Sequence, residues 1–269
     1  MIDGFVQNLM SAWAAMTWPA RIATLAWIAA TMGMPIVRWI WGERGLRWGV
    51  TASVLLQAAA VLIILASAWG WARTGLLALA IVSMGWAVEF LGSRTGVPFG
   101  RYQYTDRLQP QLGHVPLLIP AAWLMMMPPA WAVAQYITGC TGPGAISLAF
   151  VAVSALTFTA WDLFLDPQMV GWRLWVWERP GGYFGIPWVN YAGWALAAAV
   201  MTAVMRVGFC PGTLPAVPLV GIYALTWLLE TVGLGILWRK PGPAACGFVG
   251  MGGLLLWAWI ASGPGWALG

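Results

Sequence analysis

Charged side chains are scarce in this chain. Only 8% of its 269 residues are charged, whereas about 25% is usual for a soluble domain. Hydrophobic residues make up 61%, so too few polar side chains remain to cover a surface in contact with water. The apolar runs are continuous and about 20 residues long, which suits transmembrane helices and not the shorter strands of a barrel. The composition therefore predicts an all-α, polytopic transmembrane helix bundle.

Residues that bind common cofactors are also rare. His114 is the only histidine and Lys240 the only lysine, which excludes histidine-rich di-iron sites, paired-histidine haem sites and a retinal Schiff base within a span. The sequence contains no P-loop and no glycine-rich dinucleotide motif. Cys140, Cys210 and Cys246 form no metal or redox motif, and the first two fit either a disulfide or two unrelated thiols. We expect no cofactor and no metal.

Long apolar segments divide the chain into about eight predicted spans with partial parallel hairpin repeats. The spans are residues 21–41, 48–71, 75–91, 115–137, 145–165, 187–207, 214–238 and 244–261. Because of its prolines, we expect the fourth span to be kinked or to start late. We expect an interfacial helix within residues 1–20, a single transmembrane domain over 21–262 and a short tail at 263–269.

Basic residues are distributed unevenly between the loops. The loops after the first, third, fifth and seventh spans carry ten basic residues, and the opposite side carries three. Basic loops usually stay on the cytoplasmic side, so we predict a multi-pass protein of the inner (cytoplasmic) membrane with both termini outside. The net charge of +5 then reflects topology and lipid headgroups, and we expect no nucleic-acid partner.

Three of the spans carry an acid near their predicted cytoplasmic end. These acids are Glu89, Asp162 and Glu230, each with a tryptophan shortly before it. The spans that follow the first two acids also match in part, since Trp123 and Trp194 each stand seven residues after a proline. Helical hairpins repeated in parallel would bring the three acids to one depth.

Ionisable side chains inside a membrane span are costly and usually functional. Asp162 and Asp166 are spaced i, i+4 and share a helix face, although Asp166 precedes Pro167 and could instead cap or turn the chain. For the buried acids, ion pairs with arginine that only hold helices together are the alternative. Asn190 and Tyr191 can hydrogen-bond a carboxyl or a water.

Tryptophans alternate in the loop before the sixth span. Trp172, Trp175 and Trp177 are typical of an interfacial belt.

Acid–base chemistry on an apolar molecule, near the inner leaflet, is the chemistry that remains for this chain. A buried carboxylic acid can stay protonated because desolvation raises its pKa, and it can then protonate an alkene. The resulting tertiary cation needs carboxylate charge and aromatic faces nearby.

Four ordered motifs lie within residues 80–240. They read E-F-L-G-x-x-T-G-x-P-F-G-x-Y-x-Y, L-G-H-V-P-L-L-I-P-x-x-W, W-D-L-F-L-D-P and G-G-Y-F-G-I-P-W-V-N-Y-x-G-W. Together they resemble the membrane carotenoid hydratases, which comprise the 1′,2′-hydratases of γ-carotene-type end groups and the bisanhydrobacterioruberin hydratases of haloarchaea.

The resemblance implies a hydro-lyase of carotenoid biosynthesis. Without a cofactor, it would add water across the terminal C1=C2 double bond of an acyclic (ψ) carotenoid end group and give a tertiary alcohol. The implied partners are the carotenoid in the bilayer and membrane lipids, and an association with other carotenoid enzymes is left open. The residues and motifs together nominate Asp162, Glu89, Asp166 and Glu230 as catalytic, and Arg94, Arg101, Tyr102, Tyr104, Trp161, Tyr183 and Asn190 as substrate-binding.

The predicted mechanism begins with a neutral carboxylic acid. Asp162 or Glu89 protonates the less substituted alkene carbon, and a second carboxylate, with Asn190, orients the attacking water. A lycopene-type cyclase would start with the same protonation and capture the cation with another double bond. A proton-coupled transporter and a carotenoid- or lipid-binding protein without turnover are the alternatives from other classes.

Overall fold

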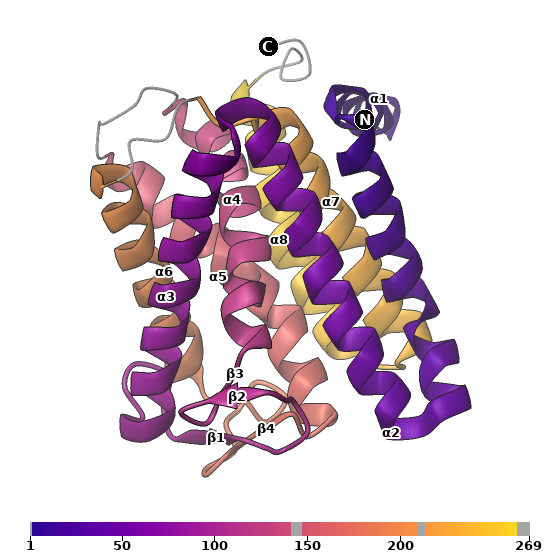
Figure 1. The fold of residues 1–269 in the computed structure, drawn as a ribbon, viewed down its shortest axis with the longest axis vertical. Coiled ribbons are helices and arrows are strands. Elements are labelled where there is room, and N and C mark those ends of the chain that lie inside the picture. Colours follow the sequence, from indigo (N-terminus) through magenta and orange to yellow (C-terminus); the bar gives the residue numbers. More distant parts are fainter. Residues whose placement is uncertain (1, 141–146, 209–212, 263–269) are drawn as a thin grey trace.

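The computed structural model describes residues 2–140, 147–208 and 213–262, and it is predominantly helical (Figure 1). The helices are α1 (Ile2–Ala15), α2 (Trp18–Trp69), α3 (Trp71–Thr95), α4 (Leu118–Thr138), α5 (Leu148–Gly171), α6 (Trp188–Gly208), α7 (Ala216–Val232) and α8 (Pro241–Ser262), with the π-helical segment η1 (Gly233–Leu237) after α7. The short strands β1 (Tyr102–Tyr104), β2 (Gln111–Leu112), β3 (Val115–Pro116) and β4 (Trp175–Trp177) belong to two loops. The prediction of an all-α helix bundle is confirmed.

The first two predicted spans are the two arms of α2. Gly42 interrupts the helix with a φ of 59° and a ψ of −137°, a conformation that glycine adopts readily. Thr31 Oγ1 donates to Ser53 Oγ across the arms at 3.2 Å, and the hydroxyls of Thr17 and Ser67 lie 3.4 Å apart. Residues 18–41 and 43–69 therefore run antiparallel (Figure 1).

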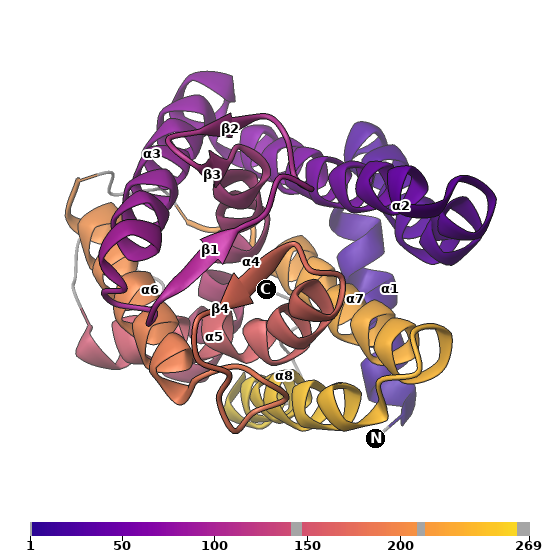
Figure 2. The ribbon, with the colours of Figure 1, turned by 90° about the horizontal axis from the view of Figure 1, so that it is seen from below.

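Within the described ranges, six helices are long and apolar enough to cross a membrane: α2, α3, α5, α6, α7 with η1, and α8. The eight predicted spans correspond to these helices when the arms of α2 are counted separately and α4 is added. α4 lies inside the bundle, in contact with α2, α3, α5, α7 and α8 (Figure 2). It begins later than the predicted fourth span, because Val115 and Pro116 form β3.

The connections after the first, third, fifth and seventh predicted spans meet at one end of the bundle (Figures 1 and 2). β1 pairs antiparallel with β4. Arg107 Nη1 donates to Glu43 Oε2 at 2.6 Å beside the turn of α2, and Lys240 Nζ donates to the Pro167 carbonyl at 2.6 Å. The loops that carry most of the positive charge thus share one end, and the cytoplasmic orientation of that end stays a prediction.

The N-terminal helix α1 lies across the opposite end of the bundle (Figure 1). Arg21 donates from Nε to the Trp13 carbonyl at 3.0 Å and from Nη2 to the Ala14 carbonyl at 2.9 Å. It therefore supplies hydrogen bonds to carbonyl groups in the last turn of α1. The interfacial position of residues 1–20 and the proposed domain limits stay predictions. Cys140 Sγ accepts a hydrogen bond from Arg206 Nη2 at 3.4 Å, whereas Cys210 and the tail at 263–269 lie outside the described residues.

The close approach of α6 to the loop after α3 gives a stability prediction. A Cβ on Gly193 would lie 2.6 Å from the Pro98 carbonyl oxygen, and a backbone atom has little freedom to move aside. We expect Gly193→Ala to lower the free energy of unfolding by about 1–3 kcal/mol and therefore the midpoint of thermal unfolding in detergent. Gly253→Ala in α8 is the control, because no atom lies within 4 Å of the added Cβ, and alanine suits a helix interior better than glycine. Equal midpoints for the two variants would contradict the close packing.

Candidate active site

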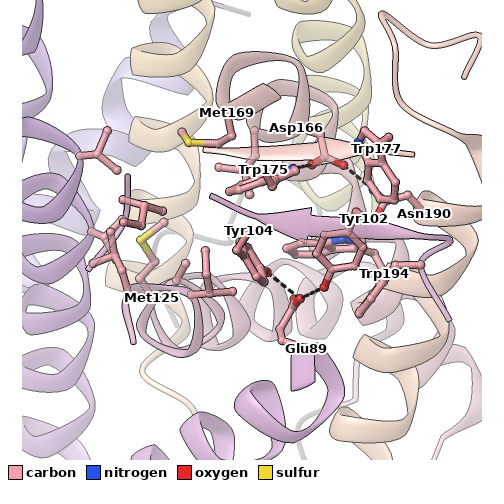
Figure 3. A pocket seen from close by; sticks show the side chains of 18 residues that line it. Glu89, Tyr102, Tyr104, Met125, Asp166, Met169, Trp175, Trp177, Asn190 and Trp194 are labelled. Atoms are coloured by element: carbon pink, nitrogen blue, oxygen red, sulfur yellow. Dashed lines mark hydrogen bonds between the residues drawn. The ribbon is translucent and has the colours of Figure 1, made fainter. Parts of the chain in front are cut away.

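Glu89 accepts three hydrogen bonds near the end of α3, where its side chain is 2% exposed. The hydroxyls of Tyr102 and Tyr104 donate to Oε2 at 2.5 and 2.7 Å, and Trp123 Nε1 donates to Oε1 at 3.1 Å (Figure 3). Among the described residues, the salt bridges of acidic side chains involve only Glu43. The alternative that arginine pairs with the buried acids is therefore not supported.

The two tyrosines reach Glu89 because they alternate along β1. Side chains two residues apart in a strand point to the same face, so Tyr102 and Tyr104 both turn inward while Gln103 is exposed. Burial raises the pKa of both phenols well above the usual range, and the nearby Glu89 charge adds to the effect. Both hydroxyls therefore stay protonated and remain hydrogen-bond donors.

Asp162 and Asp166 lie one turn apart on α5 and share Asn190 of α6. Asn190 Nδ2 donates to Asp162 Oδ2 at 2.9 Å and also to Asp166 Oδ2. Trp175 Nε1 donates to Asp166 Oδ1 at 2.8 Å. The two residues are 0% and 2% exposed, so both carboxyls are buried beside a shared amide donor. The prediction that Asn190 can hydrogen-bond a carboxyl is confirmed.

A cavity of about 50 Å³ joins the two carboxyl centres. Glu89 and Asp166 both line it, and Figure 3 shows them on opposite sides of Tyr104 and Trp175. The aromatic side chains around it are Phe99, Tyr102, Tyr104, Trp175, Trp177 and Trp194. A space of this size holds a few water molecules or the tip of a hydrocarbon chain. We call it the reaction cavity.

The two tryptophans that the partial repeat aligned meet beside this cavity. The rings of Trp123 and Trp194 stack with centroids 4.9 Å apart and planes 9° apart, and Phe158 stacks on both. The two hairpins α3–α4 and α5–α6 therefore contribute equivalent side chains to one aromatic wall.

Within the described residues, no group of three or more His, Cys, Asp or Glu side chains could hold a metal ion.

Three predicted substrate-binding residues lie away from the reaction cavity. Arg94 and Arg101 are exposed, and neither lines the cavity. The Tyr183 hydroxyl donates to the Leu163 carbonyl at 3.0 Å. Pro167 has no N–H to offer that carbonyl within α5, so Tyr183 replaces the missing helical hydrogen bond. Their roles in substrate binding stay predictions.

Trp161 and Glu230 line a second cavity, of about 60 Å³. Glu230 comes from α7, and no hydrogen bond or salt bridge joins it to another described side chain. The structure therefore brings Glu89, Asp162 and Asp166 together with Asn190 but leaves Glu230 in a neighbouring space. The sequence indicates no donor role for Trp123 or Trp175, whose indole N–H groups donate to Glu89 and Asp166.

Comparisons with known proteins agree with the resemblance in the motifs. Residues 49–252 match the model of a family described as "Carotenoid biosynthesis protein". A bisanhydrobacterioruberin hydratase from Haloarcula japonica is 32% identical over 138 residues, which cover 51% of this chain and 46% of the relative. The match thus spans about half the length of that curated relative. No solved structure matches significantly.

Proposed function

Because the chain belongs to the carotenoid biosynthesis protein family, we propose that it adds water to the terminal C1=C2 double bond of an acyclic (ψ) carotenoid end group and forms a tertiary alcohol. The single observation that carries this proposal is the arrangement of two carboxyl centres around one small aromatic cavity. Hydration of an alkene needs an acid on one side of the double bond, a base for the attacking water, and stabilisation of the cation between them.

We assign the acid to the Asp162–Asp166 pair. Two neighbouring carboxyls rarely ionise together, because like charges repel. Oδ1 of Asp162 is buried without a hydrogen-bond partner among the described residues, and such an atom costs less when the group is neutral. Asp166 lines the cavity, so the proton held by the pair passes from Asp162 to Asp166 and from there to C2, and the positive charge develops on C1.

The aromatic wall and Glu89 then stabilise the tertiary cation. Aromatic faces attract cations, and tryptophan and tyrosine rings surround the cavity. Burial opposes a charge on Glu89, and the three donors offset that cost by stabilising the carboxylate. A carboxylate at this position attracts the positive charge on C1 without neutralising it.

Glu89 also serves as the base for water. A water molecule in the cavity attacks C1, and Glu89 removes a proton as the new C–O bond forms. The net change is the addition of one water, and the proton on Glu89 returns to the aspartate pair through solvent before the next turnover. The protein is a membrane protein, and we propose that this end of the bundle faces the cytoplasm, where water is available.

The tyrosine donors give a graded test. We expect Tyr102→Phe and Tyr104→Phe each to lower the hydration rate about tenfold, because each removes one hydrogen bond to the Glu89 carboxylate, worth about 1.5 kcal/mol or more. Tyr223→Phe is the matched control, since its buried hydroxyl donates to the Thr157 carbonyl at 2.9 Å and it lines neither cavity. Initial rates with a ψ-end carotenoid in detergent would measure the effect. Wild-type rates in both cavity variants would exclude this role for Glu89.

A further inference from the structure

The reaction cavity is far too small for a whole carotenoid. Its volume of about 50 Å³ accommodates the end group only, while the polyene that follows is many carbon atoms long. If the end group reacts between Glu89 and Asp166, the remaining chain must leave the cavity through one of its walls. Open space lies behind the wall toward α2 and α7.

That space is the second cavity, whose volume is about 60 Å³. Five side chains line both cavities and separate them: Val50, Val54, Met125, Leu165 and Met169. All five are apolar, and two are methionines, whose unbranched side chains change conformation at low cost. Small movements of Met125 and Met169 would join the two cavities into one passage.

The first arm of α2 and η1 both contribute lining residues to the second cavity. Trp27, Trp161 and Trp238 provide a lining of flat apolar rings. Two of its lining residues, Met32 and Leu237, are each 39% exposed, so the cavity reaches the surface of the bundle there. The adjoining η1 is π-helical, a form that is rare and frequent at functional sites.

Most polar side chains of the second cavity already have partners. Gln57 Nε2 donates to Thr226 Oγ1 at 3.0 Å, and Thr31 Oγ1 donates to Ser53 Oγ at 3.2 Å. Because these polar groups already form hydrogen bonds with each other, they need no polar ligand. Glu230 is the one acidic side chain among the lining residues, so the space carries little charge and suits a hydrocarbon.

We propose that the second cavity is a lateral portal through which a long, linear polyene enters from the bilayer. The end group passes Met125 and Met169 into the reaction cavity, and the polyene stays behind it along Trp161 and Trp27. This inference rests on the proposed hydration only for the position of the reacting end. The binding path itself can be tested without turnover.

A substitution that fills the portal should slow the reaction of long substrates and leave the reaction of short ones unchanged. Ser53→Phe places a ring in the second cavity, whereas Leu55→Phe changes an exposed side chain of the same arm that lines neither cavity. We expect Ser53→Phe to lower the rate with a full-length ψ-end carotenoid at least tenfold. A short isoprenoid with the same end group should react at the wild-type rate, and Leu55→Phe should change neither rate. Equal losses with both substrates, or no loss with either, would overturn the portal.

Photocrosslinking tests the same path when no substrate is converted. A photoreactive amino acid at Leu229, which lines only the second cavity, should attach the pigment far more than one at Leu76, an exposed residue of α3. Coloured protein would be quantified after illumination and denaturation. Equal attachment at the two positions would overturn the portal even if hydration is observed. Preferential attachment at Leu229 without any hydrated product would uphold the portal and contradict the proposed reaction.

Discussion

Glu89→Gln is expected to lower the hydration rate by about 10²–10⁴-fold, the range that general acid–base groups contribute. Glutamine fits the same space and can still meet Trp123 and the two tyrosines, but it carries no negative charge and cannot take a proton from water. The loss should therefore be chemical and not structural. Product formed from a ψ-end carotenoid would be quantified by liquid chromatography with mass detection.

Two controls make this result specific to the site. Glu178→Gln removes the charge of an exposed loop acid next to Trp177 and should leave the rate unchanged. The thermal unfolding midpoint of Glu89→Gln in detergent should stay close to that of the wild type. A folded Glu89→Gln protein with full activity would remove Glu89 from the mechanism.

Asp166→Asn is expected to abolish hydration to a similar extent, because asparagine has no acidic proton to give to the alkene. Asp162→Asn should also lower the rate strongly, since Asp162 and Asp166 share Asn190. Groups that act as a unit are not additive, so the double variant should be about as slow as the slower single variant. Asp106→Asn, at an exposed loop position, is the control.

The double variant decides between a pair and two independent acids. If the two single losses multiply in the double variant, Asp162 and Asp166 act separately and no proton is shared between them. If Asp166→Asn keeps the wild-type rate, the acid must be sought elsewhere among the buried carboxyls.

The helix bundle could be predicted from the sequence because span length and apolar composition are local properties. The four basic connections gather at one end, as the uneven distribution of basic residues predicted, and the cytoplasmic orientation of that end stays a prediction. The place of the reversal within α2 was also predictable, because the charged residues Glu43, Arg44 and Arg47 separate the first two predicted spans. That Gly42 alone would make the reversal was not, because other glycines of this sequence lie inside continuous helix.

The carboxyl cluster was predictable in part from the cost of burying acidic side chains. Glu89, Asp162 and Asp166 are costly to bury, so their presence in apolar segments already indicates a site. An interfacial tryptophan and a tryptophan that donates to a buried carboxyl look alike in sequence, as Trp175 illustrates. Only the pairing of β1 with β4, two distant segments, brings its indole inward.

Asp166 shows how tertiary contacts can override a local signal. The proline after it allowed a turn at the end of the fifth span, yet α5 continues through Pro167 to Gly171. The Tyr183 hydroxyl satisfies the Leu163 carbonyl that Pro167 leaves without a partner, which offsets part of the cost of the proline. Tyr183 lies in a distant loop, so the span length alone could not reveal this compensation.

The most direct test is to incubate the purified protein with a ψ-end carotenoid in water labelled with heavy oxygen, without cofactors or molecular oxygen, and to determine the mass of the product. We expect a product heavier than the substrate by one labelled water, formed by the wild type and not by Glu89→Gln. A product of unchanged mass with a new ring would indicate a cyclase. Pigment that remains bound and unaltered would contradict the proposed hydration.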